Sequence, residues 1–194
     1  MAAFRILEDF YREVMRSYPP QGEALLERIR PETWRQISFR YIFSVPAMTA
    51  VSWMIEDAAA QSRGTADLHV SFQVLSRFLP QLDRYRAFSS GIARGWIYAA
   101  PDISDISGLM LPAPIRWINT SGTPLVEYWF VIAYGPGLAM TLLAREIPAL
   151  DGSGRYYEGF YTFEGEIAYQ VLMILHILFP ADVPMPSRPE EQRW

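Results

Sequence analysis

The sequence predicts an α+β domain, in which an antiparallel sheet of about five strands is packed by helices and preceded by N-terminal helices. Two observations predict this class. Apolar residues before residue 94 recur mostly at helical spacing, whereas the later segments are short apolar runs separated by Pro, Gly, Asp and Ser. An apolar segment at 164–179 then has the length of a helix. At 194 residues the chain is long enough for one domain with a substantial core.

Helices dominate the expected first half. Residues 2–18 carry apolar side chains at helical spacing and end before Pro19-Pro20. A strand is expected at 37–43, and Pro46 favours the start of a helix because proline is tolerated in the first helical turn. The other helical segments expected here are 23–30, a turn at 32–36, 46–61, 68–79 and 82–92.

Strands dominate the expected second half, at 94–99, 114–119, 127–134, 138–145 and 156–163. In the strand from Glu127, alternation places Trp129 on one face and Tyr128 and Phe130 on the other. Both faces are apolar, which is typical of a central strand covered on both sides. We divide the chain into a helical extension (1–36), a domain (37–180) and a flexible, proline-rich tail (181–194).

The residue types that are missing exclude several kinds of chemistry. The chain has neither Cys nor Lys, which excludes disulfides, thiolate metal sites, Schiff-base cofactors and the phosphate-binding loop that needs lysine. The formal net charge of −4 argues against a nucleic-acid partner. The first residues soon become charged, and the helix at 164–179 is short for a bilayer, so we expect a cytoplasmic protein without a membrane span.

Several motifs occur together in a recognisable order. They are VSWMIEDAAAQ (51–61), FQVLSRFLPQLDRYR (72–86), EYWFVIAYGPGLAMTLLARE (127–146) and YYEGFYTFE (156–164). Together they resemble the DICT family, a sensory domain found in diguanylate cyclases and two-component systems, over roughly residues 40–180. The positions that carry the resemblance are Ser52, Ile55, Glu56, Asp57, Phe72 through Phe78, Trp129 through Val131, Ala144 through Glu146, Gly159, Thr162 and Phe163.

The resemblance implies a bacterial, non-enzymatic sensory domain that binds a small ligand or a signalling protein. The sequence shows no cyclase signature, phosphoacceptor helix or DNA-reading helix, so we expect it to act through a partner in trans. A histidine kinase or a diguanylate cyclase would be such a partner. We expect no catalytic residue and no metal site, and the identity of any cofactor stays open.

The candidate ligand-binding residues combine aromatic side chains with two charged ones. We expect Trp96, Trp129, Tyr134 and Phe160 to line a pocket for a planar ligand, although a packed core would give the same pattern. Glu56 and Arg145 are the charged candidates.

The charged groups and the histidines also allow purely structural interpretations. Three roles stay open for Glu56: it contacts a ligand, lies on a solvated helix face, or holds an arginine from the cluster Arg77, Arg84, Arg86 and Arg94. We consider Glu56–Arg145 and Glu146–Arg77 bridges, because buried charge persists when paired. The arginine cluster itself suits a phosphate surface or a solvated face. For His69 and His176 we favour capping and core roles over haem ligation.

A second hypothesis is an interaction or assembly protein. The helices within 2–36 would then form a homodimer or dock on a larger complex, since the resemblance does not reach that segment.

Overall fold

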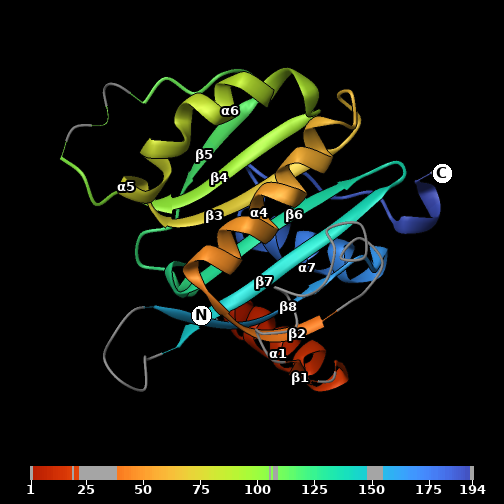
Figure 1. The fold of residues 1–194 in the computed structure, drawn as a ribbon. Helices are drawn as coiled ribbons and strands as arrows, with labels where there is room; N and C mark the ends of the chain where they lie inside the picture. Colours follow the sequence, from red (N-terminus) through yellow and green to blue (C-terminus); the bar gives the residue numbers. More distant parts are fainter. Residues whose placement is uncertain are drawn as a thin grey trace.

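A single mixed sheet organises the chain, and helices lie on both of its faces (Figure 1). The computed structural model describes residues 2–18, 20–21, 39–104, 106, 109–147 and 155–192. The α+β class is confirmed, with strands and helices packed as layers around two apolar cores.

The sheet has eight strands in the order β1-β2-β8-β7-β6-β3-β4-β5. The expected antiparallel sheet of about five strands is therefore only partly right. The pairings β2–β8, β8–β7, β7–β6 and β6–β3 are antiparallel, whereas β1–β2, β3–β4 and β4–β5 are parallel. The strand bounds are β1 Pro20–Gln21, β2 Phe39–Ser44, β3 Asp67–Val74, β4 Arg94–Ala100, β5 Ile115–Asn119, β6 Tyr128–Gly135, β7 Leu138–Ile147 and β8 Tyr156–Thr162.

The helix expected at 68–79 is wrong. Residues Asp67–Val74 form the central strand β3, and only Leu75–Phe78 form a short helix, α5. Apolar residues alternate up to Phe72 and then recur every three residues, at Leu75 and Phe78. A window that spans both segments blends the two periods and looks helical. This missed strand contributes one of the parallel pairings of the mixed sheet, because β3 pairs in parallel with β4.

One face of the sheet, which we call the α4 face, is covered by α4 (Val45–Ala60), α5 and α6 (Leu82–Phe88). The other, the α1/α7 face, is covered by α1 (Ala2–Ser17) and α7 (Gly165–Leu178). Figure 1 shows α4 on one side of the sheet and α7 on the other. Short 3-10 helices complete the fold: η1 Leu79–Gln81, η2 Ser89–Gly91, η3 Pro124–Glu127 and η4 Pro189–Glu191.

Strand β6 confirms the expected alternation. Trp129, Val131 and Ala133 pack in the α4-face core, whereas Tyr128, Phe130, Ile132 and Tyr134 pack in the α1/α7-face core. Strands β6 and β7 form a hairpin, and Gly135 pairs with Leu138 across its turn. Gly137 has a φ of 73°, a backbone conformation that glycine adopts without steric cost.

Helix α1 buries its apolar side within this chain. Leu7, Tyr11, Val14 and Met15 belong to the α1/α7-face core, and the Tyr11 hydroxyl donates to the Glu158 carbonyl at 2.5 Å. The expected helix at 23–30, the turn at 32–36 and the domain boundary at residue 36 lie outside the described residues. The division into extension and domain therefore stays a prediction.

The carboxy-terminal segment lies against the α1/α7 face. Val183 is buried, and the Asp182 and Ser187 carbonyls accept hydrogen bonds from Trp96 and Tyr134 of the sheet. The half-buried His176 of α7 lies 2.7 Å from the Val183 carbonyl through Nδ1. The flexibility expected for 181–194 stays a prediction, but its described residues make these contacts. Among the described helices, none combines the length and hydropathy that a membrane span needs.

Candidate ligand-binding site

The structure does not bring the six expected ligand-binding residues together, because the sheet separates them. Trp96, Tyr134 and Phe160 lie on the α1/α7 face. Trp129 packs on the α4 face, where Glu56 of α4 also lies. A single enclosed pocket lined by Trp96, Trp129, Tyr134 and Phe160 is therefore not formed.

The three aromatic residues on the α1/α7 face are packed as core. Phe160 is fully buried, with the Tyr11 and Tyr18 rings at 6.4 and 6.0 Å. The Trp96 indole N–H donates to the Asp182 carbonyl at 3.0 Å, and the Tyr134 hydroxyl donates to the Ser187 carbonyl at 2.8 Å. Each polar tip is thus satisfied by protein backbone, as expected of buried aromatic residues.

The expected ion pairs involve other partners. Arg145 binds Glu127 at 2.9 Å and Glu8 of α1 at 3.5 Å, so it serves the α1 side of the sheet. Glu56 binds Arg84 at 3.0 Å, which confirms the interpretation that it holds an arginine of the cluster at 77–94. Glu146 pairs with Arg155 at 2.8 Å and not with Arg77. The Glu56–Arg145 and Glu146–Arg77 bridges are therefore wrong.

A cavity of about 260 Å³ lies on the α4 face, between α4 and the sheet. One stripe of α4 forms a wall through Val45, Thr49, Ser52, Trp53 and Glu56. Their spacing of three and four residues places them on the same side of the helix. We call this space the α4 cavity.

The opposite wall comes from the sheet and from the segment after β3. Val70 and Phe72 of β3 and Trp129 of β6 supply the floor, and Arg77 of α5 and Arg155 lie at one end. The Trp129 indole N–H donates to the Ser52 hydroxyl at 3.0 Å, which ties the floor to the helix. The Tyr157 ring meets Trp129 edge-on, with centroids 5.3 Å apart.

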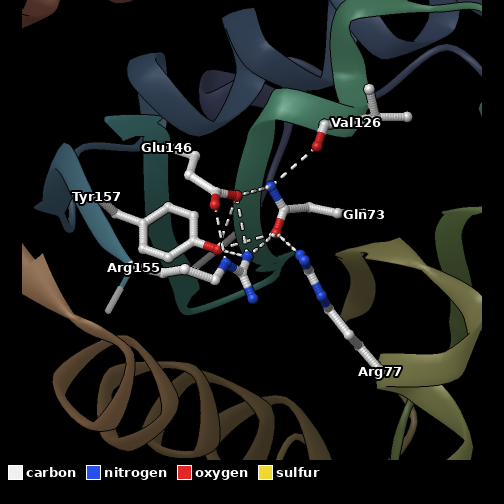
Figure 2. Close-up of polar contacts among 6 residues, drawn as sticks. All are labelled: Gln73, Arg77, Val126, Glu146, Arg155 and Tyr157. Atoms are coloured by element: carbon white, nitrogen blue, oxygen red, sulfur yellow. Dashed lines mark hydrogen bonds and ion pairs between the residues drawn. The ribbon is translucent and has the colours of Figure 1, made fainter. Parts of the chain in front are cut away.

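A polar cluster built around Gln73 borders the α4 cavity (Figure 2). The Gln73 Nε2 donates to the Val126 carbonyl at 2.9 Å and to Glu146 at 3.1 Å. Because a carbonyl can only accept, this contact turns Oε1 of Gln73 the other way, toward the arginines. There Oε1 accepts from Arg77, from Arg155 at 2.7 Å and from the Tyr157 hydroxyl at 2.9 Å.

A β-bulge in β3 presents Gln73 to this cluster. The register of β3 with β4 shifts between Ser71 and Gln73, and Gln73 has a φ of 65°. Phe72 contacts Phe78 and Tyr85 of the α4-face core. The consecutive side chains of Phe72 and Gln73 therefore both lie on the α4 face of the sheet. Bulges re-aim side chains in this way, and a left-handed glutamine is a conformation kept only where its surroundings hold it.

Charges around the α4 cavity are matched except at Arg77. Glu56 is buried and accepts from Tyr85 at 2.7 Å and from Arg84. Burial raises the pKa of the Glu56 carboxyl, and these two hydrogen bonds oppose that rise. Arg155 has Glu146 as its partner.

Arg77 differs from its neighbours in having only an amide partner. Among the described residues, no carboxylate lies within ion-pair distance of its guanidinium, which donates to the neutral Gln73. Burial, and then the nearby charge of Arg155, lower the pKa of Arg77, against smaller opposing effects of Glu146 and Asp102. The end of the cavity thus carries one cation without an ion-pair partner among the described side chains.

A second cavity, of about 770 Å³, lies at the other end of β3 and β6, where the carboxy-terminal segment forms one wall. Its charged strand residues, Asp67 and Arg94, bind each other at 3.0 and 2.5 Å. His69 is buried beside it, stacked on Trp96 at 4.2 Å and 2.9 Å from the Tyr98 hydroxyl. Burial lowers the pKa of His69 to about 3, so its imidazole is neutral at pH 7. The two charged strand residues of this cavity are thus paired with each other, whereas Arg77 of the α4 cavity has no ion-pair partner among the described residues. We therefore place the candidate site at the α4 cavity.

Sequence reasoning found part of the α4 cavity and missed the rest. It singled out Trp129 and Glu56, and it named Arg77 in the arginine cluster. It missed Gln73, Glu146 as a partner of Arg155, and Arg155 itself, because these residues meet only in the folded sheet. Among the described residues, no group of three or more His, Asp or Glu side chains could hold a metal ion.

Comparison with known families gives one match. The model of the DICT family, described as a sensory domain in diguanylate cyclases and two-component systems, matches residues 25–147, more than half of the chain. This span includes α4, β3, α5 and β6, and therefore most of the α4-cavity lining, but Arg155 lies beyond it. No curated protein and no solved structure matches the chain.

Proposed function

The chain belongs to the DICT family of sensory domains, and on that premise we propose that it senses a small molecule held in the α4 cavity. We propose further that it is non-enzymatic and passes the signal to a separate protein. The sensory description belongs to the family, whereas the ligand, the site and the partner are our proposals.

The observation that carries the proposal is the α4 cavity itself. Ligand sites in proteins are concave and mostly apolar, with a few polar groups that fix orientation. The α4 cavity has this character: Val70, Phe72 and Trp129 form the apolar floor, and Arg77 and Arg155 lie at one end.

The position of the α4 cavity suits a sensory role. Helix α4 contributes one wall, and its Trp129–Ser52 hydrogen bond joins it to the sheet. A ligand between α4 and the sheet would contact both, so its binding free energy would favour one position of α4. The partner that reads this position would be a two-component kinase or a diguanylate cyclase, the proteins in which the family occurs.

Native mass spectrometry of the full chain purified from its own host tests the proposal. We expect a mass excess that corresponds to a bound small molecule. The variant Thr49→Phe fills the cavity from α4 and should abolish the excess. Ala50→Phe adds the same ring at the exposed neighbouring position, so it serves as the matched control and should keep the excess.

Two results would contradict the proposal. One is a chain of bare mass that also fails to bind small molecules offered in solution. The other is a bound molecule that survives Thr49→Phe, which would place it elsewhere in the protein.

Docking or dimerisation through the N-terminal helices stays a second proposal. Its support is weaker than the sequence suggested, because α1 already packs its apolar side on its own sheet and on α7. Light scattering on the full chain and on a chain lacking residues 1–36 would test it. A loss of self-association on deletion is the expected result, and an unchanged monomer would contradict it.

A further inference from the structure

We propose that the α4 cavity selects an organic anion, with Arg77 and Arg155 binding its carboxylate or phosphate group and Trp129 and Phe72 contacting its flat apolar body. This inference rests on the proposed sensory function and adds the chemical class of the ligand.

The first step is the charge at the end of the cavity. Three charged side chains line the α4 cavity: Glu56, Arg77 and Arg155. Glu56 is bound by Arg84, which also binds Asp57, and Arg155 is bound by Glu146. Arg77 is the charged lining residue that has no ion-pair partner among the described residues, and an anionic ligand would supply that partner.

The second step is hydrogen bonding. The Gln73 Oε1 accepts from Arg77, Arg155 and Tyr157 together, although a carbonyl oxygen has two lone pairs. In the described structure, the hydrogen bonds of Arg77 go to Gln73 alone, yet a guanidinium has five N–H donors. Donors thus outnumber acceptors at this end, and Figure 2 shows both guanidinium groups converging on the Gln73 amide. An oxyanion matches the planar fork of arginine and would accept the surplus hydrogen bonds.

The third step is the shape and polarity of the rest of the cavity. Two contacts hold the indole of Trp129: its hydrogen bond to Ser52 and the edge-to-face contact with the Tyr157 ring. Phe72 adds a second aromatic wall and Val70 an aliphatic one. A flat apolar group packs favourably against such walls, and a volume of about 260 Å³ suits a molecule of one or two rings.

The experiment compares two probes of nearly equal shape, naphthalene-2-carboxylate and naphthalene-2-carboxamide. Each is titrated into the full chain by calorimetry, with tryptophan fluorescence as a second readout. We expect the carboxylate to bind at least ~10-fold more tightly than the neutral carboxamide, as charge-assisted hydrogen bonds to arginine require. Naphthyl phosphate, titrated in parallel, decides which oxyanion fits better.

The variant Arg77→Gln should remove this preference, because it weakens carboxylate binding more than carboxamide binding. Arg116→Gln, which deletes the same charge at an exposed position on the edge strand β5, is the matched control and should keep the preference. Circular dichroism and thermal unfolding of both variants establish that they fold.

The outcomes separate this inference from the proposed function. Equal binding of the two probes, or a preference that survives Arg77→Gln, would overturn the inference while the sensory pocket stands. Co-purification of a neutral small molecule with the protein from its own host would also overturn the inference and leave the sensory pocket standing. Binding of neither probe, together with a bare chain from the host, would overturn both.

Discussion

The two faces of the sheet are built from the same strands, yet they differ in what their aromatic residues contact. On the α1/α7 face, Trp96, Tyr134 and Phe160 are buried. The Trp96 indole N–H and the Tyr134 hydroxyl donate to backbone carbonyls of the carboxy-terminal segment. On the α4 face, Trp129 and Phe72 are half-buried and border a cavity. Tyr134 of the α1/α7 face also borders the larger cavity, but the charged strand residues of that cavity, Asp67 and Arg94, bind each other. In the α4 cavity, Arg77 has no ion-pair partner among the described residues.

The difference teaches that alternation along a strand assigns a residue to a face but does not reveal whether that face is filled. Trp129 and Phe130 are neighbours in sequence, and both are apolar. Phe130 is buried between the sheet and α7, whereas Trp129 borders the α4 cavity. The covering helices, which lie far away in the sequence, decide the outcome.

The largest expected effect is on the α1/α7 face. Phe160→Ala should lower the free energy of unfolding by about 3–5 kcal/mol, because it leaves a void under Tyr11 and Tyr18 that the packed core cannot close. Urea unfolding followed by circular dichroism measures the change. A loss below about 1 kcal/mol would show that this face is as loosely filled as the other.

A pH effect comes next, also on the α1/α7 face. The folded state holds the pKa of His69 near 3, against 6.5 for the free side chain, and burial is the main cause. Below pH 6.5 the unfolded chain takes up a proton that the folded chain refuses. Stability should therefore be full above pH 6.5 and fall as the pH drops toward 3, by up to about 1.4 kcal/mol per pH unit.

The variant His69→Asn isolates this effect, because it keeps a polar group beside Tyr98 and cannot titrate. Unfolding free energies of both proteins between pH 7 and pH 5 should converge as the pH falls. Parallel curves would mean that His69 protonates in the folded state, and that this face is open to water.

Trp129→Phe should have a smaller effect, on the α4 face. It removes the hydrogen bond to Ser52 but keeps a ring on the cavity floor, so the expected loss of stability is about 1 kcal/mol. Ser52→Ala is its partner variant, and a double-mutant cycle should show that the two losses are not additive. Full additivity would mean that the two side chains do not interact in solution.

The smallest expected effect on stability is that of Arg77→Gln. Its guanidinium has only the Gln73 amide as partner in the described structure, so unfolding free energy should change by no more than about 0.5 kcal/mol. Thermal unfolding of the variant checks this. A loss of several kcal/mol would indicate that Arg77 serves the fold, and would remove the contrast between a structural face and a binding face.

The sequence predicts the local elements better than their assembly. Helix α4 was expected at 46–61 and occupies Val45–Ala60, because proline and helical periodicity mark it clearly. Strand β3 was missed because its alternation passes directly into α5 without a turn residue between them. That error hides the parallel pairing of β3 with β4, but β4 and β5 are also parallel although both are expected as strands, so their relative direction is a second thing that the sequence does not predict.

The candidate site shows the same limit. Trp129 and Glu56 could be named from their residue types, and Arg77 from its charge. Gln73 adopts a left-handed conformation at a bulge, for which a glutamine gives no sequence signal. Arg155 and Glu146 lie on either side of a long connection and meet through the pairing of β7 with β8. Such contacts depend on register, which local patterns do not encode.

The central claim is that the α4 face binds a ligand and the α1/α7 face does not, and the two faces carry their own reporters. The indole N–H groups of Trp129 and Trp96 give separate signals in a ¹H–¹⁵N spectrum, assigned through Trp129→Phe and Trp96→Phe. On titration with naphthalene-2-carboxylate, the Trp129 signal should shift saturably while the Trp96 signal stays in place. A Trp96 shift with a stationary Trp129 signal would contradict the account.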